Sequence, residues 1–87
     1  MIAVLTHSLS MARIWLEVDF EAVFTNYRSG ILPGGRQFFI CTSERDLRAR
    51  RDITEYWEGP PVYVGFADFR KLYEMRVLAE CILEYRK

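Results

Sequence analysis

Three carboxylates and a tryptophan recur at alternate positions in the first quarter of the chain. The row consists of Trp15, Glu17, Asp19 and Glu21, and the alternating positions of 12–24 are apolar. A period of two sends one set of side chains into a core and the other into water, as in a half-buried β-strand. We therefore expect a strand over 12–24 that presents an acidic and aromatic face to solvent.

The chemistry of this row favours binding over catalysis. Side chains two apart on a strand are about 7 Å apart, close to the spacing of phosphates along a nucleic acid strand, so the acids would imitate a phosphate track for a basic partner. The alternative is a solvated face whose charges prevent edge-to-edge strand pairing. We expect no metal site, because carboxylates in a straight row point in parallel and do not converge on a cation.

Four arginines form a second charged cluster, and Trp57 follows them in the sequence. They are Arg45, Arg48, Arg50 and Arg51, with acidic residues interleaved among them. Mixed charge of this kind is typical of a solvent-exposed helix with weak ion pairs. The functional alternative is nucleic-acid binding, in which the arginines contact phosphates and Trp57 stacks on a base.

The elements that must position these residues include several strands. Apolar, β-branched or alternating runs predict strands over 2–6, 12–24, 36–42 and 62–66. The Gly and Pro residues of 26–35 predict a loop, after which the strand over 36–42 would pair antiparallel with the preceding one. A mostly antiparallel sheet of three or four strands is expected.

Two helices are expected to accompany this sheet. Ser43, with Asp46 three residues later, approximates a capping box and predicts a helix over 44–57 at the edge of the sheet. The apolar period of 67–85 predicts a longer helix packed on one face of the sheet. Its expected inward stripe consists of Phe69, Leu72, Met75, Ala79 and Ile82. The predicted fold class is therefore α+β.

Composition bounds the class of protein. The 87 residues suit a single domain over 1–87, and 51% hydrophobic residues indicate a folded globule. The aromatic share of 15% exceeds what one small core usually holds, which is consistent with a homodimer or larger homo-oligomer. Twelve basic and twelve acidic residues give a formal charge of zero, which argues against coating nucleic acid or anionic lipid through bulk charge.

The absence of a long apolar run in the sequence predicts a cytoplasmic protein that does not enter membranes. Cys41 and Cys81 are the only cysteines. They are interpreted as buried free thiols in a reducing compartment, with a single disulfide as the alternative.

No catalytic or cofactor motif is found in the sequence, so we expect neither an enzyme nor a bound cofactor or metal. The expected function is a non-catalytic protein-interaction module, of the small inhibitor kind that phages and other mobile elements encode. It would dock the row Trp15, Glu17, Asp19 and Glu21 on a basic surface of a host nucleic-acid-handling protein. The alternative is a small nucleic-acid-binding regulator that uses the arginine-rich segment 44–57.

Overall fold

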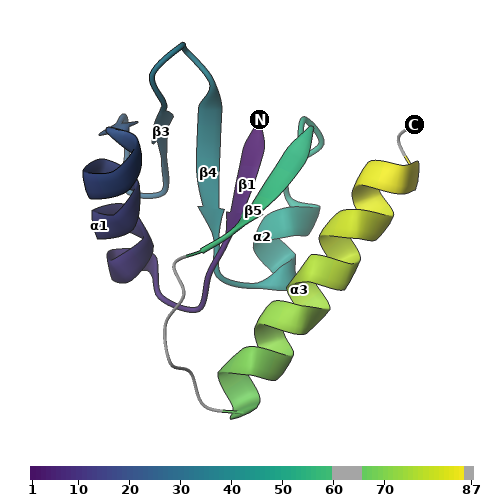
Figure 1. Ribbon diagram of the computed structural model, residues 1–87. Helices are drawn as coiled ribbons and strands as arrows, with labels where there is room; N and C mark the ends of the chain where they lie inside the picture. The colour runs from purple at the N-terminus through teal and green to yellow at the C-terminus, as the bar shows by residue number, and fades with distance from the viewer. Residues whose placement is uncertain (60–65, 86–87) are drawn as a thin grey trace.

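The chain forms five strands and three helices within residues 1–59 and 66–85, the part that the computed structural model describes (Figure 1). In chain order they are β1 (Ile2–Leu5), α1 (Leu9–Phe20), β2 (Val23–Phe24), β3 (Ser29–Ile31), β4 (Gln37–Cys41), α2 (Glu44–Arg48), β5 (Glu55–Glu58) and α3 (Phe66–Tyr85). The α+β class is confirmed.

The sheet is mixed, with the strand order β2-β3-β4-β1-β5. β1 runs parallel to both of its neighbours, β4 and β5, whereas β3 pairs antiparallel with β2 and with β4. The prediction of a mostly antiparallel sheet with three or four strands is therefore wrong. Parallel neighbours need crossover connections, and sequence patterns along single segments do not reveal which distant segments will pair.

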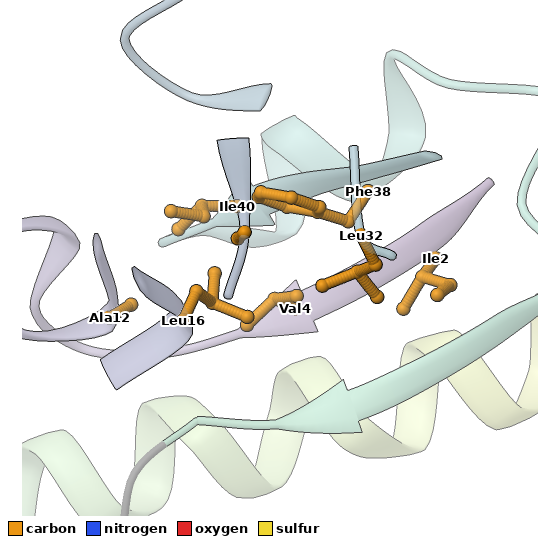
Figure 2. Close-up of a cluster of buried hydrophobic side chains, with 8 residues drawn as sticks. Ile2, Val4, Ala12, Leu16, Leu32, Phe38 and Ile40 are labelled. Carbon is orange, nitrogen blue, oxygen red and sulfur yellow. The ribbon is translucent and has the colours of Figure 1, made fainter. Parts of the chain in front are cut away.

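Helices cover both faces of the sheet, and each face has its own apolar core. Figure 1 shows α1 on one side and α2 with α3 on the other. The core beneath α1, drawn in Figure 2, consists of Ile2, Val4, Ala12, Leu16, Ala22, Leu32, Phe38 and Ile40. The core beneath α2 and α3 consists of Ala3, Leu5, Phe39, Cys41, Leu47, Ile53, Met75 and Ala79. The alternation of β1 and β4 residues between the two cores follows from the period of two along a strand.

The segment predicted as a strand over 12–24 is mostly the helix α1. Ser8 caps it by accepting a hydrogen bond from the Met11 backbone N–H, and Glu21 ends it in the left-handed conformation with φ 55°. Only Ala12 and Leu16, which are one helical turn apart, are fully buried. The expected row of acids along a pleated face does not exist.

The alternation was misleading because the even positions fall on all sides of the helix. Ala12 and Leu16 point inward, but Ile14 and Val18 are 63% and 73% exposed. The helix has one apolar stripe that faces the core and another that faces solvent. Together the two stripes give the sequence an apolar residue at every second position. Tertiary context decides between the helix and the strand, because a helix provides the crossover from β1 to the parallel strand β4.

The helix expected over 44–57 is much shorter. Its predicted N-cap is confirmed, since the Ser43 side chain accepts a hydrogen bond from the Asp46 N–H, but α2 ends at Arg48. Residues 55–58 form β5 instead, beside β1, and the Thr54 N–H donates to the Met1 carbonyl to begin this alignment. One edge of β1 is available for pairing, and aromatic residues such as Tyr56 and Trp57 are common in strands. The hydrogen bonding of 55–58 to β1 outweighs the helix propensity of this segment.

The long C-terminal helix is confirmed as α3, with one change to its inward stripe. Met75 and Ala79 are buried, whereas Phe69 is 60% exposed. The expected strand over 62–66 lies outside the described residues except for Phe66, which begins α3. No helix in 1–59 or 66–85 has the length and apolar character needed to cross a membrane.

Removing the cap of α1 tests the helix directly. Ser8→Ala removes the acceptor for the Met11 N–H, and we expect the free energy of unfolding to fall by about 1 kcal/mol in urea titrations. Glu17→Ala, at an exposed position of the same helix, is the control and should change it by less than about 0.5 kcal/mol. Equal effects of the two substitutions would contradict the cap.

Because Cys41 is buried, the free energy of unfolding should fall at alkaline pH. Burial raises the pKa of its thiol from 9.0 to about 12. The folded protein holds this proton more tightly than the unfolded chain, so the stabilisation is complete below pH 9 and is lost as pH rises from 9 through 12. We expect a loss of about 1.4 kcal/mol per pH unit in that window. Cys41→Val should flatten the pH profile of unfolding, whereas Cys81→Val, at an exposed thiol, should leave it unchanged.

Candidate functional site: two charged surfaces on opposite faces of the sheet

The outward side of α1 carries an apolar stripe. Met11, Ile14 and Val18 are spaced three and four residues apart, which places them on one side of the helix. They are 44%, 63% and 73% exposed, although each is large and hydrophobic. Scattered apolar residues are ordinary on a protein surface, but a contiguous stripe is a candidate interaction site.

Three exposed carboxylates accompany this stripe. Glu17, Asp19 and Glu21 form no ion pair with any residue in the described part of the chain. Among the other carboxylates whose side chains are described, only Glu84 also lacks one. The stripe and the three acids together are called the α1 outer face below.

The helix arranges the predicted row differently from a strand. Residues two apart differ by about 200° around a helix, so Glu17 and Asp19 lie on opposite flanks of the apolar stripe. Trp15, expected to be exposed, is half-buried and packs edge-on against Phe20 with ring centroids 4.9 Å apart. Trp15 therefore belongs to the margin of the core, while the acids stay on the surface.

Arg13 fastens α1 to the hairpin formed by β2 and β3. Its guanidinium lies 4.1 Å from the centre of the Phe24 ring and donates a hydrogen bond of 2.6 Å to the Tyr27 carbonyl. Leu16 anchors the helix in the core, and Ser8 caps its N-terminus. These contacts fix the position of α1, with its outer face toward solvent.

An open groove lies on the opposite face, between the α2 region and the C-terminal part of α3. Its volume is about 610 Å³, and its lining consists of Leu47, Arg48, Arg50, Arg51, Cys81, Ile82 and Tyr85. We call it the arginine groove. It gathers three of the four predicted arginines but not Arg45.

Two arginines of the groove, Arg48 and Arg50, have a carboxylate nearby. Arg48 lies 3.9 Å from Glu44, and Arg50 lies 3.9 Å from Asp52, with exposed side chains in both pairs. The guanidinium carbon of Arg50 also lies 4.9 Å from the centre of the Phe39 ring. Exposed ion pairs at such distances contribute little to stability, so the pair with Glu44 leaves the charge of Arg48 available at the groove.

Trp57 is remote from these arginines. It lies on β5 and packs against Phe20, from α1, with ring centroids 5.0 Å apart, while its indole N–H donates to Glu55. The predicted combination of four arginines with Trp57 is therefore wrong as a single surface. Tyr85, which is 94% exposed, supplies the aromatic ring at the groove instead. Sequence reasoning missed Tyr85 because only the packing of α3 beside α2 brings it there.

The carboxyl ends of the parallel strands form the edge at which open α/β sheets often bind ligands. The hydroxyls found at this edge have structural roles. Thr6 exchanges hydrogen bonds with Ser8, and Asp46 accepts from the Thr42 N–H at 2.9 Å. Within the described residues there is no group of three or more His, Cys, Asp or Glu side chains placed to hold a metal ion.

Comparison of the chain with protein-family models, with curated proteins and with solved structures finds no match. The α1 outer face and the arginine groove are therefore the two candidate functional surfaces.

The two thiols should differ sharply in reactivity. Both are free, but Cys41 is buried and Cys81 is exposed in the groove lining. Because the thiolate is the nucleophile and burial raises the pKa of Cys41 to about 12, a maleimide probe at neutral pH should label Cys81 alone. Peptide mass spectrometry of the folded protein measures this. Labelling of both cysteines at similar rates would contradict the packing of Cys41.

Proposed function

We propose that this protein is a non-catalytic protein-interaction module that docks through the α1 outer face. The partner surface is an apolar groove bordered by Lys or Arg side chains. The observation that carries the proposal is the union of an exposed apolar stripe with three carboxylates that have no ionic partner among the described residues.

The apolar stripe supplies the driving force for docking. Full burial of a Val or Ile side chain is worth about 1.5–3 kcal/mol, and Ile14 and Val18 are both mostly exposed in the free protein. An amphipathic helix laid in a hydrophobic groove is a common mode of recognition, with anchors three, four and seven residues apart. Met11, Ile14 and Val18 have this spacing.

The carboxylates favour association with a positively charged partner surface. Glu17, Asp19 and Glu21 break no ion pair with the described residues when they meet a cation on a partner. Complementary charge at the rim of an interface mainly accelerates association and excludes wrong partners. Association should therefore weaken as salt is raised.

The helical shape of this segment does not suit the expected phosphate-like row of acids. A phosphate-like track needs acids in a straight row about 7 Å apart, and this spacing belongs to a strand. The proposal therefore specifies a basic and apolar protein surface and no longer draws on phosphate mimicry. Trp15 contributes by supporting α1 from its inner margin.

Charge reversal on α1 tests the proposal. In affinity capture from the native host, Glu17→Lys with Asp19→Lys should lower recovery of specific partners at least about tenfold, because attraction becomes repulsion. Glu84→Lys is the matched control, since Glu84 is the other described carboxylate that is exposed and without an ion pair. All variants should retain the thermal stability of the parent protein.

A second pair of variants removes the stripe. Ile14→Ser with Val18→Ser should abolish the same capture without unfolding the protein, because both side chains are mostly outside the core. The proposal is wrong if the captured proteins are the same, in identity and amount, for the parent, the charge-reversed and the serine variants.

A further inference from the structure

The arginine groove has the dimensions and make-up of a small-molecule site. Its volume of about 610 Å³ falls within the range of about 300–1,000 Å³ that is usual for ligand pockets. Leu47 and Ile82 contribute apolar side chains, and Arg48, Arg50 and Arg51 also line the groove. An apolar lining with a few charged groups is typical of sites that orient one kind of ligand.

The charge of the groove favours a phosphate-bearing ligand. A guanidinium presents planar, paired donors that match phosphate oxygens, and it binds them in a bidentate manner. Glu44 is 3.9 Å from Arg48, so a phosphate can approach this arginine without disrupting a short ion pair with Glu44. Arg51 is exposed and makes no ion pair with the residues that the structure describes.

Tyr85 adds an aromatic surface beside these cations. Its ring is 94% exposed at the C-terminal end of α3 and lines the groove together with Arg48 and Arg51. Aromatic side chains next to arginines are the usual means of holding unpaired bases, with the base stacked on the ring and the phosphate on the cations.

We propose that the arginine groove binds a nucleotide unit, with its phosphate at Arg48 and Arg51 and its base against Tyr85. This site lies on the face of the sheet opposite α1, so it goes beyond the proposed protein docking and is independent of it. The same unit occurs in free nucleotides and in single-stranded nucleic acid, and the two sources are separated by experiment below.

Cys81 provides a reporter that needs no mutation. It is exposed and lines the groove, while the other thiol is buried. A bound nucleotide should slow the reaction of Cys81 with a maleimide probe. The ligands to compare are a nucleoside monophosphate, a short oligothymidylate, inorganic phosphate and an acidic peptide, each titrated at low salt. The concentration that gives half protection measures affinity, so differences in intrinsic thiol reactivity between variants do not matter.

Matched substitutions identify the residues responsible. Arg48→Gln with Arg51→Gln should raise the half-protection concentration by at least about tenfold, because charge-assisted hydrogen bonds to phosphate are lost. Arg45→Gln is the control, since Arg45 lies on the same helix but does not line the groove. Tyr85→Ala should weaken binding by a similar factor, and Tyr85→Phe should restore it because the ring remains.

The outcomes are distinct. Protection by the monophosphate supports a free nucleotide as the ligand, and protection by the oligothymidylate at much lower concentration supports single-stranded nucleic acid. Protection by the acidic peptide alone, by inorganic phosphate as well as by the monophosphate, or by no ligand at millimolar concentration would overturn the nucleotide assignment. Equal weakening by Arg45→Gln and by the double substitution would overturn the site. None of these results bears on docking through α1.

Discussion

The position of β1 between two parallel neighbours is the constraint on which the rest of this structure depends. All four of its residues are buried, and they contribute alternately to the two cores. Parallel strands cannot be joined by a tight hairpin, so the chain must leave β1, cross a face of the sheet and return. α1 lies on the path to β4 and α2 on the path to β5, and the helices on opposite faces shield both cores from water.

This arrangement also separates the charges of a chain whose formal net charge is zero. Around β5 and α3, opposite charges meet: Arg76 pairs with Glu58, and the Tyr56 hydroxyl donates to Glu80, a hydrogen bond that raises the pKa of Tyr56. On the other side of the sheet, the acids of α1 have no such partners among residues 1–59 and 66–85. The result is one face that carries these acids and, across the sheet, a groove lined by three arginines.

Each surface combines charge with exposed apolar atoms, which is the combination that recognition requires. On α1 the apolar residues are aliphatic and follow the helix, a shape suited to a groove on another protein. In the arginine groove they form a concave lining with an aromatic ring, a shape suited to a small or thread-like ligand. The sheet keeps these two surfaces apart.

The sequence by itself determined the class of fold, the strands near 2–6 and 36–42, the cap at Ser43 and the long C-terminal helix. These depend on local patterns: short β-branched runs, a hydroxyl before a helix and a sustained helical period. Only the tertiary structure decided that 12–24 would be mostly helical, that 55–58 would be a strand, and that Tyr85 rather than Trp57 would join the arginines. In each case the deciding free energy comes from pairing or packing with a distant segment, and a single stretch of sequence does not identify that segment.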